Sequence, residues 1–67
     1  MSEFLLVAPE GWQQLEVASS GMSSDTIQCS SMQTITEMLR IAGMIGEQDI
    51  VEEVRIFGNE SFFIRLA

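Results

Sequence analysis

The chain has 67 residues, with ten acidic residues against three arginines and neither lysine nor histidine, so its formal net charge is −7. A chain of this length is expected to form one small domain, residues 1–67, around one core. Three scattered arginines do not make the basic footprint that nucleic acids and anionic membranes require, so direct binding to either is not expected.

The chain has few internal means of stabilisation. Cys29 is the only cysteine, which excludes an internal disulfide, and no Cys and His set exists to hold zinc. The apolar residues together with five glycines exceed half of the chain. Part of this apolar surface is therefore expected in an interface, with a protein partner or in a homo-oligomer. The lone thiol and the lack of a long apolar run predict a protein of a reducing cytoplasm, or of a particle assembled there.

The N-terminal part of the chain predicts a first hairpin over Phe4–Val17. Residues Glu3–Ala8 form a short apolar run that Pro and Gly interrupt at positions 9 and 11, which is typical of a strand followed by a tight turn. From Trp12 to Val17, apolar and polar residues alternate as in a strand with one dry face. An extended loop around Trp12 is the alternative.

The middle of the chain predicts a loop followed by one helix. Ala18–Ser24 is small, polar and without a period, which is typical of a loop, and Thr26–Cys29 is expected to be extended or an irregular turn. The stretch Ser30–Gly46 predicts an amphipathic helix, with Ser30 favoured over Asp25 as its N-cap and Gly46 as a left-handed residue beyond its end. Its apolar residues recur at steps of three and four: Met32, Ile35, Met38, Leu39, Ala42 and Ile45.

The C-terminal third predicts a second hairpin with a definite register. A three-residue loop, Gly58-Asn59-Glu60, pairs Ile56 with Phe62, Val54 with Ile64, and Glu53 with Arg65. A two-residue turn would mix charged and apolar residues on one face, because a shift of one residue reverses every side chain. We therefore expect the three-residue loop, with Asn59 or a neighbour at positive φ.

These elements predict an α+β fold in the order ββαββ, a small, mainly antiparallel sheet with one amphipathic helix packed on one face. Phe57 and Phe63 are expected on the opposite face, where exposed aromatic side chains indicate an interface. The residues expected to face the core are Leu5, Val7, Leu15, Val17, Ile35, Leu39, Ala42, Val54, Ile56, Phe62, Ile64 and Leu66.

No catalytic, cofactor or metal site stands out, so neither an enzyme nor a small-molecule substrate is expected. A nucleophile paired with histidine is impossible in a chain without histidine. Cys29 is expected to be a small buried thiol rather than an activated one. The only acidic cluster is best read as a solvated charge run, because it lacks the spacing and the glycine of a calcium loop: Glu47, Asp49, Glu52 and Glu53.

The remaining candidates are residues that could bind another protein. Trp12 lies beside a predicted turn and could anchor a partner or cap the end of the core, while Met44 lies off the main helical stripe. With Phe57 and Phe63 they favour a non-enzymatic structural or assembly protein. The alternative is a small acidic inhibitor that mimics DNA and occupies a basic groove through Glu47, Asp49, Glu52, Glu53 and Glu60.

Residues 4–12 read Phe-Leu-Leu-Val-Ala-Pro-Glu-Gly-Trp. This opening resembles the start of short uncharacterised proteins that tailed bacteriophages encode in the region specifying the virion. The resemblance implies a small accessory component of the phage particle, docked on a head, connector or tail protein. It would make the chain virion-associated, and it carries over no functional residues.

Overall fold

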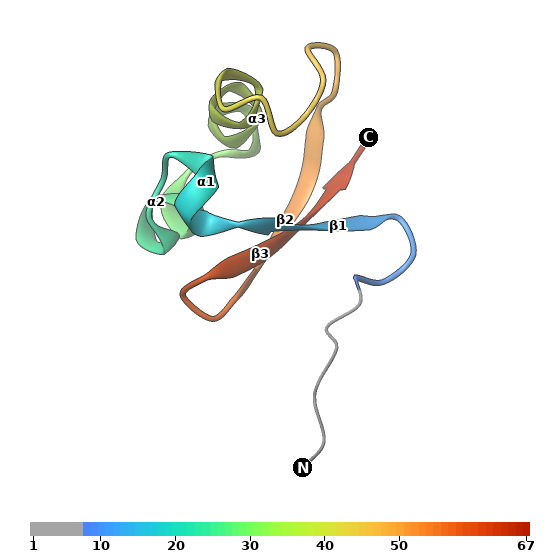
Figure 1. The fold of residues 1–67 in the computed structure, drawn as a ribbon. Coiled ribbons are helices and arrows are strands. Elements are labelled where there is room, and N and C mark those ends of the chain that lie inside the picture. The colour runs from blue at the N-terminus through green and yellow to red at the C-terminus, as the bar shows by residue number, and fades with distance from the viewer. Residues whose placement is uncertain (1–7) are drawn as a thin grey trace.

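The computed structural model describes residues 8–67, which fold as three short helices against a small sheet (Figure 1). The sheet has three antiparallel strands in the order β1-β3-β2. The predicted α+β class is confirmed. Three helices rather than one separate β1 from β2, and the predicted strand Glu3–Ala8 lies outside the described residues except for its last position. The elements are β1 (Trp12–Glu16), α1 (Val17–Ser20), α2 (Ser24–Cys29), α3 (Met32–Ile41), β2 (Val51–Phe57) and β3 (Ser61–Leu66).

The C-terminal hairpin has the register that the sequence predicts. Ile56 pairs with Phe62, Val54 with Ile64, and Glu53 with Arg65. Gly58 has a φ of +74°, so the positive φ falls on the neighbour of Asn59. Glycine adopts this conformation without the steric cost of a Cβ atom, and the three-residue loop can therefore close.

β1 lies on the other side of β3 and fixes which residues share a face. It begins at a turn in which the N–H of Trp12 donates to the Pro9 carbonyl at 2.9 Å. Trp12 pairs with Arg65 and Leu15 with Phe62. The predicted strand is confirmed to within one residue, because β1 ends at Glu16 and Val17 begins α1.

The prediction of a loop over Ala18–Ser24 is wrong, because this segment contains most of α1 and the start of α2, and the prediction of an extended piece or irregular turn over Thr26–Cys29 is wrong because these residues are helical in α2. The Ser20 side chain is only 1% exposed, and its hydroxyl donates to the Val17 carbonyl at 2.7 Å and accepts from the N–H of Met22 at 3.1 Å. The Ser23 hydroxyl then caps α2 by accepting from the N–H of Thr26 at 3.1 Å. The serines suggested a loop, but here their hydroxyls accept hydrogen bonds from backbone N–H groups that lack a carbonyl partner at the helix ends.

α3 corresponds to the predicted amphipathic helix, but it begins and ends at other residues than predicted. Ser31 is its N-cap and accepts from the N–H of Thr34 at 3.1 Å, whereas Ser30 ends α2. The left-handed residue beyond the helix is Gly43, with a φ of +74°, so the prediction for Gly46 is wrong. Ala42, predicted to face the core, is exposed: it is the C-cap of the helix and is not part of the core cluster. No helix in the described part of the chain is long and apolar enough to span a bilayer.

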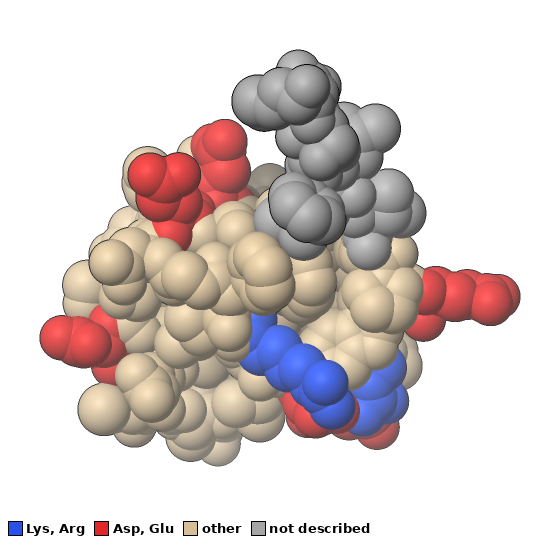
Figure 2. All heavy atoms as spheres, turned by 90° about the horizontal axis from the view of Figure 1, so that it is seen from below, with Lys and Arg blue, Asp and Glu red and all other residues tan. Residues whose placement is uncertain are grey.

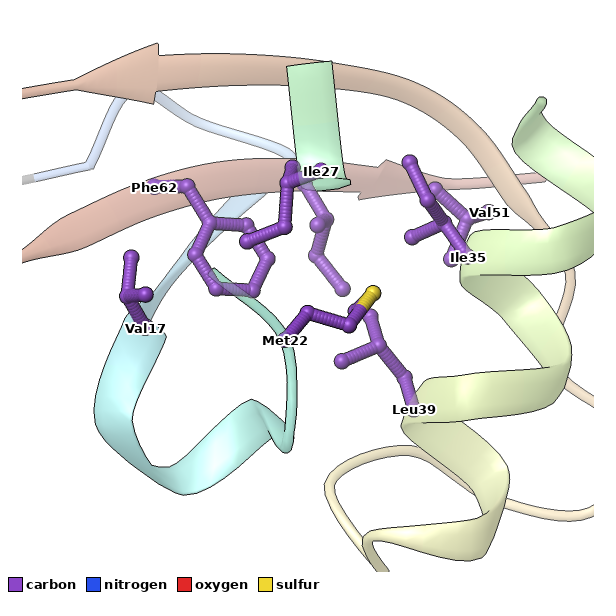
Figure 3. Packing of buried hydrophobic residues seen from close by; sticks show 8 residues of the cluster. Val17, Met22, Ile27, Ile35, Leu39, Val51 and Phe62 are labelled. Atoms are coloured by element: carbon purple, nitrogen blue, oxygen red, sulfur yellow. The ribbon is translucent and has the colours of Figure 1, made fainter. Parts of the chain in front are cut away.

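The core lies between the helices and the inner face of the sheet (Figure 3). Ile35, Leu39, Phe62 and Ile64 are fully buried, as predicted. Met22 and Ile27, from the segments predicted to be irregular, also point into this cluster. The other predicted inner residues of the sheet are half-buried around it: Leu15, Val54, Ile56 and Leu66. Leu5 and Val7 lie outside the described residues.

Candidate protein-binding face

The sheet face opposite the helices carries three aromatic rings, one from each strand. Because side chains alternate along a strand, the register that sends Phe62 and Ile64 to the core sends Phe63 and Arg65 to the other side. We call this side the outer face. Its residues are Trp12, Gln14, Glu16, Glu53, Arg55, Phe57, Ser61, Phe63 and Arg65, and Glu52, at the bulge of β2, also reaches Arg65.

Phe57 and Phe63 form a stacked pair on the outer face. Their ring centroids lie 5.9 Å apart and their planes differ by 11°. Phe57 is 49% exposed, and Phe63 is half-buried beneath it. Stacking restricts both rings before any partner arrives, so binding there would cost less side-chain entropy.

Trp12 completes the aromatic surface and lies next to two guanidinium groups. The Cζ atom of Arg55 is 5.4 Å from the centre of its ring, and that of Arg65 is 5.6 Å away. Both distances are within the range in which a cation is attracted by an indole ring. The arginines therefore help to hold Trp12 in place while leaving it partly exposed.

The same arginines are paired with carboxylates. Arg65 Nη2 donates to Glu53 Oε1 at 2.7 Å, and Arg65 also donates to Glu52. Arg55 Nε lies 3.7 Å from Glu53 Oε2. The hydrogen bond from Arg65 lowers the pKa of Glu53 below its usual value, and the same bond raises the pKa of Arg65.

These pairs balance the charges beside Trp12 in a strongly acidic chain. Two of the three basic residues lie here with Glu52 and Glu53, so the charges balance within the group. In the view from below, basic and acidic side chains touch at one place, while other acidic side chains project singly around the margin (Figure 2). A partner approaching these paired charges meets little net electrostatic repulsion.

A shallow hollow of about 420 Å³ lies among the aromatic rings. Its size suits one or two apolar side chains of a partner protein. It is lined by Pro9, Trp12, Arg55, Ile56, Phe57 and Phe63.

The structure brings together three of the four residues predicted to bind a partner. Trp12, Phe57 and Phe63 share the outer face, whereas Met44 is half-buried against the core, on the helical side of the sheet. A contact through Met44 stays a prediction. Sequence reasoning missed Arg55 and Arg65 as neighbours of Trp12, because that contact depends on β1 pairing with β3.

The predicted acidic cluster is divided between two places. Asp49 Oδ2 accepts from the N–H of Gly46 at 2.8 Å and closes a turn, while Glu52 and Glu53 pair with Arg65 on the outer face. Within residues 8–67, no group of three acidic or cysteine side chains is placed to hold a metal ion. Cys29 is exposed, so the prediction of a buried thiol is wrong: its side chain lies at the end of α2, away from the core.

Comparison with protein-family models, with curated proteins and with solved structures finds no match for this chain, so the case for its function depends on the geometry of the outer face.

Proposed function

We propose that this chain is a non-enzymatic structural or assembly protein that binds another protein through its outer face. The observation that carries the proposal is the exposed Phe57, stacked on Phe63 beside Trp12, where the charges are balanced. Exposed apolar patches on small proteins mark interaction surfaces, and aromatic residues and arginine are enriched at the centres of interfaces.

The hollow and its surroundings suggest the chemistry of the partner. An apolar or aromatic side chain would fill the space between Trp12 and Phe57, where it would be removed from water. Arg55 is 70% exposed and could turn from Glu53 to a carboxylate of the partner. The resemblance of residues 4–12 favours a partner among the head, connector or tail proteins of a phage particle.

The test is affinity capture of partners from the native host with matched variants. Phe57→Ser removes the exposed ring, and Ile41→Ser removes an apolar side chain that is 81% exposed on α3. We expect the same protein to be captured by the native chain and by Ile41→Ser, at low and at high salt, and to be lost with Phe57→Ser. Capture that Phe57→Ser leaves intact would contradict the proposal.

The same salt series tests the acidic-inhibitor alternative. Binding to a basic groove falls steeply as salt rises, whereas binding through apolar contacts does not. The geometry gives this alternative less support, because Glu52 and Glu53 are already paired with Arg65. A partner released by moderate salt would favour the inhibitor.

A further inference from the structure

β2 is an edge strand among the described residues, and the hydrogen-bond pattern shows which of its groups face outward. The N–H of Val17 donates to the Glu60 carbonyl at 2.9 Å, which directs the even-numbered residues of β3 toward β1. The odd-numbered residues of β3 therefore bond to their partners in β2: Glu53, Arg55 and Phe57. It follows that the N–H and C=O groups of Val54 and Ile56 point to the free edge.

The backbone groups at one end of this edge have hydrogen-bond partners, whereas those in its middle have none among the described residues. Thr36 Oγ1 accepts from the N–H of Val51 at 2.9 Å, which covers the start of β2. Within residues 8–67, no helix, loop or side chain bonds to the outward N–H groups of Val54 and Ile56. The side chains of the same two residues line a hollow of about 310 Å³ with Ile27, Gln28 and Met32.

We propose that the β2 edge pairs with β2 of a second copy of this chain, antiparallel and with the two-fold axis at Val54. This inference deepens the proposed function, and it rests on it only in that both treat the chain as a protein that binds other chains. The contact proposed here is the backbone edge of β2, whereas the proposed function depends on the aromatic rings of the outer face. Antiparallel pairing needs the outward N–H and C=O groups of the two strands to bond, and with Val54 opposite Val54 the two valines bond to each other across the axis.

Charge selects this register. With the axis at Val54, Glu53 of each copy lies opposite Arg55 of the other, so two ion pairs form across the edge. With the axis at Arg55, two arginines would face each other, and with the axis at Ile56, Arg55 would face Phe57. The sequence Glu-Val-Arg is thus complementary to itself under a two-fold axis, which is the property that an isologous interface needs.

Arg55 can move to make this contact, and Glu53 can accept from it through Oε2 while Oε1 keeps its hydrogen bond from Arg65. Arg55 is 70% exposed and its nitrogen lies 3.7 Å from Glu53 within the chain, a loose contact that can be exchanged for the one across the edge. Pairing would join the sheets of two copies and leave both sets of outer-face rings on the same side. The proposed partner face would then be presented twice by one dimer.

The backbone part of the inference is tested by sedimentation equilibrium over a range of protein concentrations. Proline at position 54 removes an outward N–H and keeps the bonds to β3, whereas Val54→Thr keeps the N–H and a β-branched side chain. We expect the native chain and Val54→Thr to approach twice the mass of one chain as concentration rises. Val54→Pro should stay at the mass of one chain while keeping its circular dichroism spectrum.

The charge part is tested by swapping signs, which does not depend on proline being tolerated. Arg55→Glu places carboxylates opposite Glu53 and should weaken the dimer about tenfold or more. Glu53→Arg should weaken it in the same way, because arginines then face each other. A mixture of the two variants restores both ion pairs, so we expect a mixed dimer that neither variant forms alone.

The outcomes separate this inference from the proposed function. Trp12→Ser changes the outer face on β1, on the far side of β3 from the β2 edge, so it should leave the dissociation constant of the dimer unchanged and abolish only the capture of the other partner. A native chain that stays at the mass of one chain at all concentrations would overturn the inference. A dimer that Arg55→Glu leaves unchanged would overturn it as well, and a dimer lost with Trp12→Ser would place self-association on the outer face instead.

Discussion

The hydroxyl of Thr36 accepts a hydrogen bond from the backbone N–H of Val51 at 2.9 Å, and this contact joins α3 to the first residue of β2. The same hydroxyl donates to the Met32 carbonyl one turn earlier, at 2.8 Å. Thr36 belongs to the polar face of the helix by sequence, yet only 4% of its surface is exposed. Its burial is acceptable because both of its hydrogen-bonding roles are filled.

Replacing Thr36 with valine should therefore destabilise the protein. Thr36→Val keeps the shape of the side chain but leaves the buried N–H of Val51 without a partner, which costs about 1–3 kcal/mol. Thr36→Ser keeps the hydroxyl and should cost less. Urea unfolding of both variants measures the difference, and a valine variant as stable as the serine variant would show that water replaces the hydroxyl.

Leu39 and Ile41 lie close together on α3 but have opposite environments. Leu39 is fully buried, whereas Ile41 is 81% exposed. Leu39→Ala should lower the free energy of unfolding by about 2–5 kcal/mol, since it leaves a cavity in the core. Ile41→Ala should change it by no more than about 0.5 kcal/mol. Thermal unfolding of the pair tests this, and equal losses would mean that Ile41 is covered in solution.

Gly58 should be sensitive to replacement because of its backbone and not because of crowding. Its φ is +74°, and a Cβ atom added there would meet nothing within 4 Å. Gly58→Ala should cost about 1–2 kcal/mol for the left-handed conformation, and Gly58→Asn should cost less, because asparagine visits that region more readily. Chemical denaturation distinguishes the two. No loss in the alanine variant would indicate that the loop takes a different conformation.

Acid should remove the contribution of Glu53 to stability. The hydrogen bond from Arg65 lowers the pKa of Glu53 in the folded protein, so the folded state favours the charged carboxylate. The stabilisation is present above the unfolded-state pKa of about 4.3 and is lost as pH falls through the lower folded-state value. The melting temperatures of the native chain and Glu53→Gln should differ at pH 7 and converge in strong acid. A difference that persists in acid would contradict this assignment.

Much of the outer face can be predicted from the sequence because it depends on one local hairpin. The alternation in residues 53–57 and 62–66, with a loop of three residues between them, admits only one register in which both faces are coherent. That register places Phe57 and Phe63 together and away from the core. The amphipathic stripe of α3, including Ile35 and Leu39, is equally local and is confirmed by their complete burial.

The remaining features depend on contacts between distant parts of the chain. α1 and α2 have four and six residues, too few to show a helical period, and they are stabilised because Met22 and Ile27 pack into the core and Ser20 bonds to the backbone of Val17 and Met22. The neighbours of Trp12 were decided when β1 paired with β3, the last strand, since Arg65 belongs to the opposite end of the chain. Sequence periodicity specifies which face of a strand is buried, but only the packed fold determines which other strand pairs with that strand.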